Sequence, residues 1–412
     1  MANLSELSSE RAARVARSSY GRLVSLLAAR DGDIGAAEDA LADAFEQALL
    51  RWPDAGIPEN PEAWLLTVAR NRRRDRARSP STRAMTPLEE IAELAALQEI
   101  DVEAIPDRRL ALLFVCAHPA IEPLVRAPLM LQTILGFGAE RIAVAFAVPA
   151  PMLAQRLVRA KRRIRDARIP FVVPDRSIIS RRLPDVLEAV YGAYAIEWYG
   201  VAGATERGTL ETEALYLAET LADLLPDEPE TLGLAALVCL SLSRAPARLD
   251  SNGALVPLQE QQTSRWDATL IERGERYLMR AHRLGCIGRF QLEAAIQSVH
   301  CDRRRTGVTD WSALRKFHGA LVEMAPTLGA TVSLAVVLGE TDGPDAGLAI
   351  LDTLDGAHAG RFQPAWVARA HLQAAAGDYA SAAESFRKAI SLTTDPPTRS
   401  LLQRQAGSLP GR

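Results

Sequence analysis

The sequence has few aromatic residues and no long apolar run. Aromatic residues make up 5% of its 412 residues, and no stretch approaches the roughly 18 consecutive apolar residues of a membrane helix. The longest candidate, residues 232–242, is better explained as a buried helix. Residues 1–17 lack the apolar core of a signal peptide. We therefore expect a cytoplasmic protein with no membrane partner.

Cysteines are also scarce, and they are widely separated. There are four: Cys116, Cys239, Cys286 and Cys301. None forms a CxxC pair, and neither Cys116 with His118 nor His300 with Cys301 has the four-ligand spacing of a zinc site. We expect reduced thiols packed in a core, and no metal.

Motifs of the common enzyme classes are missing as well. The sequence contains no GxxxxGK(S/T) loop, no GxGxxG after a strand, no GxSxG elbow and no HExxH helix. An enzyme would need a pocket of convergent polar groups that the sequence does not display. We therefore predict no catalytic residue and no cofactor.

Charge is present in quantity but unevenly distributed. Residues 1–83 sum to +1, residues 84–107 to −7 with no basic residue, residues 108–170 to +8, and the remainder to −5. A strongly basic block beside an acidic segment is typical of a nucleic-acid-binding module on a tether. The basic residues are almost all arginine, 45 of 48, which can also reflect genomic base composition.

Apolar residues recur every three or four positions almost from end to end, which predicts an all-α protein. A helix over 63–78 has an apolar face and an arginine-rich end. A short helix over 139–146, a tight connection at 147–150 and a long basic helix over 151–167 form the pattern of a helix-turn-helix. From residue 184 the chain is again helical, and residues 366–396 fit a tetratricopeptide repeat within a short solenoid.

The arginine-rich end of the first basic helix is one candidate DNA contact. Its candidate residues are Trp64, Arg70, Asn71, Arg72, Arg73 and Arg76. Arginines at helical spacing can follow a phosphate backbone, and Trp64 can stack on an unpaired base. The alternative is a solvated helix end with Trp64 in the core.

The long basic helix of the helix-turn-helix is the second candidate. The N-terminal part of such a helix meets base edges, and its later residues meet phosphate. Its candidate residues are Met152, Gln155, Arg156, Arg159, Arg162 and Arg163. The alternative is a solvated basic face.

Several segments together resemble a known family over essentially the whole chain. DALADAF at 39–45 and PEAWLLTVARN at 61–71 resemble region two of an extracytoplasmic-function (ECF) sigma factor of bacterial RNA polymerase. CAHPAI at 116–121 and the 142–161 segment resemble region four. GALVPL at 253–258 and SRWD at 264–267 resemble the subgroup whose C-terminal extension is tetratricopeptide-like.

The resemblance implies four parts: region two at 1–83, an acidic linker at 84–107, region four at 108–170 and a regulatory helical extension at 184–412. Region two would dock the clamp of the largest polymerase subunit through Asp39, Asp43 and Phe45, and would hold the melted −10 strand. Region four would read the −35 duplex and bind the β-flap. The subgroup is also associated with a small DGPF (YCII-like) protein.

Several positions depart from the family pattern, and two of them leave a rival open. Arg141 stands where an acidic residue is usual, and Met152 stands where threonine is usual. The alternative is a helical-repeat adaptor whose N-terminal half is a degenerate DNA binder independent of polymerase. Binding to core polymerase distinguishes the two.

Overall fold

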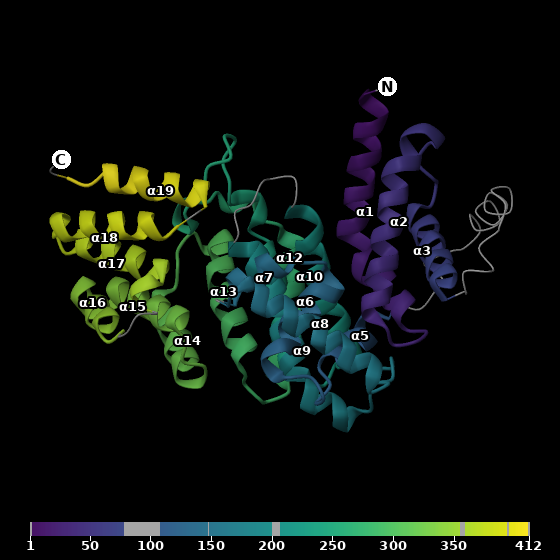
Figure 1. Ribbon diagram of the computed structural model, residues 1–412. Coiled ribbons are helices and arrows are strands. Elements are labelled where there is room, and N and C mark those ends of the chain that lie inside the picture. Colours follow the sequence, from purple (N-terminus) through teal and green to yellow (C-terminus); the bar gives the residue numbers. More distant parts are fainter. Residues whose placement is uncertain are drawn as a thin grey trace. The chain divides into compact units, whose positions relative to one another are not determined.

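The computed structural model describes residues 2–77, 108–146, 148–199, 207–354, 359–393 and 395–410 (Figure 1). Within these ranges the regular elements are helices, and β pairing is limited to one isolated bridge between Leu249 and Leu255. The predicted all-α class is confirmed. The predicted acidic linker, 84–107, lies outside the described residues. Among the described helices, none is long and apolar enough to cross a membrane.

The chain divides into two compact units. Unit 1 is Met1–Ile196 with Gly208–Leu217, and unit 2 is Glu197–Arg207 with Ala218–Arg412. The boundaries between the two units thus fall within two helices, α9 (Arg176–Tyr199) and α10 (Arg207–Leu224). The four functional parts, with boundaries at 83, 107, 170 and 184, stay a prediction.

Three helices pack together at the start of unit 1: α1 (Ala2–Ala28), α2 (Ile34–Ala55) and α3 (Pro61–Ala77). A capping side chain sets the start of each later helix. Asp33 Oδ1 accepts from the backbone N–H of Ala36 at 3.0 Å, and Asn60 Oδ1 accepts from that of Ala63 at 3.0 Å. The buried stripe of α2 ends in Trp52, which is 2% exposed. This is the helical bundle predicted for region two.

Four further helices of unit 1 form the predicted helix-turn-helix and its support. They are α5 (Arg109–Cys116), α6 (Pro123–Leu135), α7 (Ala139–Ala145) and α8 (Ala150–Asp166). Glycine at 136 ends α6 because that position has a φ of 68°, a left-handed conformation that favours glycine. The α8 helix buries residues at positions i, i+4, i+7 and i+11: Leu153, Leu157, Ala160 and Ile164. This spacing lays one face of α8 on α6 and α7.

The first helix of the extension also packs within unit 1. Asp185 of α9 pairs with Arg126 of α6 at 2.8 Å, and Arg182 Nη1 donates to the backbone oxygen of Phe114 at 3.0 Å. Further along, the Arg109 guanidinium of α5 lies 4.2 Å from the ring centroid of Tyr216 in α10. Contacts with α5 and α6 therefore fix the start of the extension.

Unit 2 is built from consecutive packed helices, teal through green to yellow in Figure 1. They are α11 (Pro229–Leu242), α12 (Ala268–Arg283), α13 (Arg289–Thr306), α14 (Trp311–Met324), α15 (Leu328–Asp342), α16 (Pro344–Asp352), α17 (Gln363–Ala375), α18 (Tyr379–Leu392) and α19 (Pro396–Gly407). Short 3-10 turns lie at Ala245–Ala247, Leu258–Glu260, Thr263–Arg265 and Ala359–Arg361. Separate apolar clusters join successive helices from α13 to α19, as the tetratricopeptide-like expectation requires.

Two predictions about the core have different outcomes. The helix at 232–242 is buried, because every residue of α11 from Thr231 to Leu242 lies in the core. Three of the four cysteines are buried, but Cys286 is exposed in the connection between α12 and α13. The prediction of a core thiol was therefore wrong for Cys286, since this loop carries it away from any helix face.

Candidate nucleic-acid interface

The solvent-facing side of α8 carries most of the residues predicted to read the −35 duplex. Gln155, Arg159, Arg162 and Arg163 are exposed, on the side away from the buried stripe of the helix. Met152 and Arg156 are half-buried, and Arg156 Nη1 lies 3.9 Å from Glu122 Oε1. The exposed face therefore combines one amide with three guanidinium groups, the donors and acceptors that reach base edges and phosphate.

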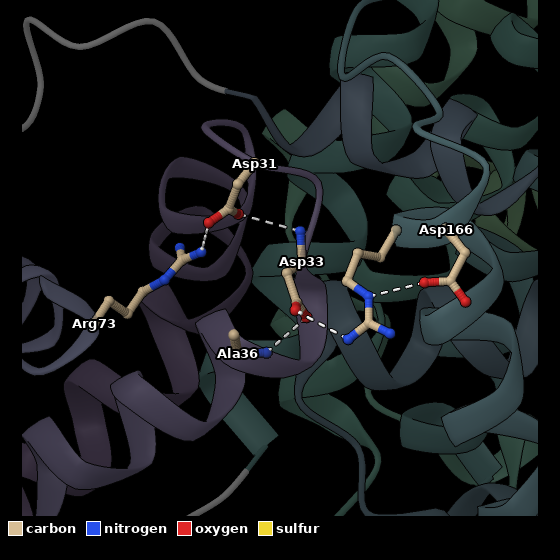
Figure 2. Close-up of polar contacts among 6 residues, drawn as sticks. Asp31, Asp33, Ala36, Arg73 and Asp166 are labelled. Carbon is tan, nitrogen blue, oxygen red and sulfur yellow. Dashed lines mark hydrogen bonds and ion pairs between the residues drawn. The ribbon is translucent and has the colours of Figure 1, made fainter. Parts of the chain in front are cut away.

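Another edge of α8 contacts the protein itself. Lys161 forms an ion pair with Glu38 of α2, and Arg165 Nη1 lies 3.5 Å from Asp33 Oδ2 at the start of α2. Figure 2 shows Asp33 on the α1–α2 turn facing the end of α8, where Asp166 lies. Lys161 and Arg165, one helical turn apart, are thus held by carboxylates of region two.

The basic side chains at the end of α3 also point in two directions. Arg70 and Arg72 are exposed and Asn71 is half-buried. Arg73 instead points back to the α1–α2 turn, where it donates to the backbone oxygen of Leu27 and pairs with Asp31 (Figure 2). The side chain of Arg76 lies outside the described residues. Sequence spacing alone groups Arg73 with the arginines that are predicted to contact DNA.

A cation that the sequence analysis missed lies beside Arg70. Partial burial lowers the pKa of the Arg70 guanidinium, and the nearby Arg30 lowers it further. Arg30 is exposed in the turn that follows α1, forty positions earlier in the chain. Two guanidinium groups that repel each other are a favourable place for a phosphate, because an anion between them relieves the repulsion.

Trp64 is only partly available for stacking. Its ring packs edge-on against Trp52 with centroids 5.6 Å apart, and the side chain is half-buried. This contact supports the alternative that Trp64 belongs to the core of region two. One side of the ring is therefore already covered, and base stacking stays a prediction.

The α2 residues predicted to bind polymerase do not share one face. Asp39 is exposed and Asp43 is half-buried, and their spacing puts them on one stripe that continues to Leu50. Phe45 is half-buried and lies outside this stripe. Leu49 and Leu50, 48% and 62% exposed, were missed by the sequence analysis although they are exposed apolar residues on the same helix. Exposed leucines beside carboxylates are typical of a protein-binding surface.

The Cys116 and His118 pair has the features of a structural contact. Burial raises the pKa of the Cys116 thiol to about 12, and its sulfur lies 3.7 Å from Thr133 Oγ1. His118 Nδ1 accepts from the backbone N–H of Ala120 at 3.1 Å, and burial followed by Arg182 and Arg126 lowers the pKa of His118. A buried protonated thiol is a poor nucleophile and a poor metal ligand. Within the described ranges, His, Cys, Asp and Glu form no group of three suited to a metal ion.

Comparison with known proteins matches two segments of the chain to protein families. Residues 15–83 match sigma-70 region 2, and residues 182–282 match a family of unknown function, DUF6596. The N-terminal part of the chain thus contains a region 2 of the sigma-70 family, and the helical part matched by DUF6596 fits a C-terminal extension to it.

Two relatives and one solved structure are similar to this chain over different lengths. An uncharacterized protein of Rhizobium meliloti is 34% identical over 383 residues, which cover 90% of each chain. The "Probable ECF RNA polymerase sigma factor SigI" of Mycobacterium tuberculosis is 32% identical over 154 residues, which cover 36% of this chain and 52% of that protein. A tetratricopeptide repeat protein from Parabacteroides merdae has a TM-score of 0.34 and 14% identity, and the match covers 65% of this chain and 98% of that one.

Proposed function

We propose that this chain binds bacterial RNA polymerase core and directs it to specific promoters, with the extension regulating that activity. The observation that carries the proposal is the exposed face of α8, where Gln155, Arg159, Arg162 and Arg163 stand clear of the helix core. If this face of α8 were buried or acidic, the helix could not enter a DNA groove. The sigma-70 region 2 match supplies the polymerase and promoter DNA as expected partners.

Each surface has a proposed role. The α8 face reads the −35 duplex, with Met152 and Arg156 at its margin. The exposed end of α3 holds the −10 strand through Arg70, Asn71, Arg72 and Arg76, joined by Arg30 and bordered by Trp64. Asp39, Asp43 and Phe45, together with Leu49 and Leu50, bind the polymerase clamp, and region four binds the β-flap. Arg73 is assigned to the α1–α2 turn, because its guanidinium is engaged there.

The Arg141 departure has a structural explanation that weakens the adaptor alternative. The Arg141 guanidinium lies 4.8 Å from the ring centroid of Phe137. Arg141 lies within α7, and Phe137 lies just before this helix. A cation stacked on an aromatic ring stabilises the start of the helix-turn-helix. The arginine therefore fits an intact DNA-binding module.

The proposed function is tested by transcription in vitro with purified core polymerase and the full chain. The template set includes genomic fragments and the region upstream of the chain's own gene. We expect the chain to bind core and to produce specific transcripts. Failure to bind core would contradict the proposal and favour the adaptor.

Regulation by the extension needs a truncation placed according to the structure. A chain that ends before residue 184 would divide α9 and remove Asp185 from Arg126. A chain ending at Leu224 keeps α9 and α10 intact. Altered transcription from this shorter chain supports a regulatory extension, and unchanged transcription contradicts it. A small DGPF partner stays a prediction that co-purification would test.

A further inference from the structure

Helices α10 and α12 of the extension line a polar cavity of about 440 Å³. Its lining residues are Glu219 and Asp223 from α10, with Arg273, Arg276, Tyr277 and Arg280 from α12. All six belong to unit 2 and lie within the segment that matches DUF6596. A cavity of this size is in the usual range of small-molecule sites, and its charged lining favours a charged ligand over an apolar one.

The spacing of the lining residues places them on one side of each helix. Positions 273, 276, 277 and 280 of α12 follow the i, i+3, i+4 and i+7 pattern, so their side chains form one stripe. Positions 219 and 223 of α10 are one helical turn apart. Ile271, Gly274 and Ala281 of α12 are buried instead. The cavity is therefore lined by one polar stripe from each helix.

Close packing fixes the wall that α12 forms. A Cβ added to Gly274 would lie 2.6 Å from Leu240 Cγ and 3.1 Å from the backbone oxygen of Ala236, both in the buried helix α11. Only a glycine allows the α12 backbone to approach α11 this closely. Gly274 directly follows Arg273 and lies three positions before Tyr277. The packing therefore holds the backbone of both lining residues, as a preorganised site requires.

Arg273 and Glu219 neutralise each other at the inner side of the cavity. Arg273 Nη1 donates to both carboxylate oxygens of Glu219, at 3.1 and 3.4 Å. Cys239 Sγ of α11 lies 3.9 Å from Glu219 Oε1, and burial raises the pKa of this thiol to about 12. A protonated thiol is a poor nucleophile, and the six lining side chains include no histidine, serine or lysine. The cavity is therefore suited to binding and not to covalent chemistry.

Two further guanidinium groups of the lining are available to a ligand. Arg276 and Arg280 are exposed and lie one turn apart, and in the described part of the chain neither is within ion-pair distance of a carboxylate. The Arg280 guanidinium lies 5.7 Å from the ring centroid of Tyr277. Burial, followed by Glu219 and Asp223, raises the pKa of Tyr277 to about 12, so its hydroxyl keeps its proton and can donate. The α12 stripe thus offers only hydrogen-bond donors to a ligand.

This arrangement matches the chemistry of a phosphate monoester. Such a group carries a charge of about −1.5 to −2 at pH 7 and three acceptor oxygens, so it can accept from Arg276 and Arg280 at once. A carboxylate has one charge and two oxygens, which a single arginine already satisfies. The exposed Asp223 repels a second anion but can accept from a hydroxyl group. The lining therefore fits a phosphate monoester whose remaining part carries hydroxyl groups.

We propose that this cavity binds the phosphate group of a small hydroxylated metabolite, a sugar phosphate by chemical class, and that the extension receives its regulatory signal there. The regulatory part of this inference rests on the proposed function, whereas binding itself requires no polymerase. Arg276 and Arg280 hold the phosphate, and Asp223 accepts from a hydroxyl group. A bound ligand therefore connects α10 to α12.

Calorimetric titration of the full chain at constant ionic strength tests the binding. The probes are ribose 5-phosphate and inorganic phosphate, with ribose and succinate as matched compounds that lack a phosphate. We expect a Kd of about 1 mM or below for ribose 5-phosphate and weaker binding of inorganic phosphate. We expect no measurable binding of ribose, and binding of succinate that is weaker than that of ribose 5-phosphate by about tenfold or more.

Modification of arginines by phenylglyoxal, followed by mass spectrometry, locates the bound probe. Saturating ribose 5-phosphate should lower the modification of Arg276 and Arg280 by about threefold or more, because a bound phosphate covers both groups. Arg304, exposed on α13 and outside the cavity, is the internal control and should be modified equally with and without the probe.

Matched variants connect the binding to these side chains. Arg276→Gln combined with Arg280→Gln should weaken the binding of ribose 5-phosphate by about tenfold or more. Arg283→Gln, also exposed on α12 but outside the lining, should bind as the unmodified chain does. All three positions are exposed, so the melting temperatures should stay unchanged and report intact folding.

Transcription in vitro at limiting core polymerase tests the regulatory role. Ribose 5-phosphate should change the transcript yield of the unmodified chain by about threefold or more, and should leave that of the double variant unchanged. A yield that the bound probe does not change would overturn the regulatory role.

Three results would overturn the binding site: no binding of either phosphate probe, equal binding of succinate, or equal binding by the double variant. Failure of the unmodified chain to bind core would instead contradict the proposed function. The titration and the arginine modification use no polymerase, so they would still report on the cavity in that case.

Discussion

Neighbouring arginines on α3 have different environments, and this difference predicts which of them are structural and which contact DNA. Arg73 is 15% exposed and donates to Leu27 and Asp31, whereas Arg72 is exposed. We expect Arg73→Ala to lower the free energy of unfolding by about 1–3 kcal/mol, because it removes charge-assisted hydrogen bonds. We expect Arg72→Ala to change stability by less than about 0.5 kcal/mol and to lower the salt slope of DNA binding by about 1.

Chemical denaturation and salt titrations of DNA binding check this pair. Each variant is the control for the other, since the two positions are adjacent. A salt slope that falls for Arg73→Ala without loss of stability would contradict the assignment.

Gly21 gives a second prediction at the residue scale. Gly21→Ala places a methyl group within 1.9 Å of the Ile134 carbonyl oxygen, so the helices have to move apart. We expect a loss of about 1–3 kcal/mol from this overpacking, with a lower melting temperature. Gly35→Ala in α2 is the control, because its nearest atom would lie at an ordinary 3.6 Å. Equal melting temperatures for the two variants would show that α1 and α6 are not packed this closely.

At the scale of single elements, the exposed and buried faces of α8 predict its DNA contacts. We expect Arg159→Ala to weaken binding to a cognate −35 duplex by about 1–3 kcal/mol, because it removes a donor from the exposed face. Asp166→Ala, also exposed on α8, is the control and should not weaken binding. Fluorescence anisotropy with cognate and scrambled duplexes measures both. Equal loss on both duplexes would assign Arg159 to phosphate, and no loss would remove it from the interface.

Sequence patterns were sufficient to predict the helices. They were insufficient to predict which side chains contact each other across different helices. The helix-turn-helix followed from apolar spacing and from the break near Pro149, and the buried α11 followed from an uninterrupted apolar run. By contrast, Lys161 and Glu38 are 123 positions apart, and Arg30 reaches Arg70 only when α1 and α3 pack. Likewise, which of several consecutive arginines turns inward depends on helix rotation against a neighbour, so Arg73 was grouped with the others.

At the scale of the whole molecule, buried histidines should make unit 2 sensitive to acid. Burial lowers the pKa of His318 to about 4, and burial, Arg244, His318 and Arg303 lower that of His300 to about 3. The ordinary value is 6.5, so below it the unfolded chain binds protons that the folded chain does not. Stability is therefore complete above about pH 6.5 and declines as the pH falls toward these lowered values.

For His318, which is 7% exposed, we expect a loss of about 2 kcal/mol at pH 5. Calorimetry of the full chain between pH 7.5 and pH 5 measures it. His318→Leu should reduce the pH dependence to the part that belongs to His300, and His282→Gln, at an exposed histidine on α12, should leave it unchanged. A pH dependence that is as steep in His318→Leu as in the unmodified chain would contradict the assignment to His318.

The enclosure of α11 also predicts how the extension changes during evolution. Twelve consecutive residues, Thr231 to Leu242, lie in the core, and Gly233 leaves no room for a Cβ beside Gln291. Almost every substitution in this helix creates a void or a clash, so selection should hold its sequence nearly constant. The neighbouring α12 exposes many of its residues and can drift. Divergence among chains with this extension should therefore concentrate on the exposed positions of α12.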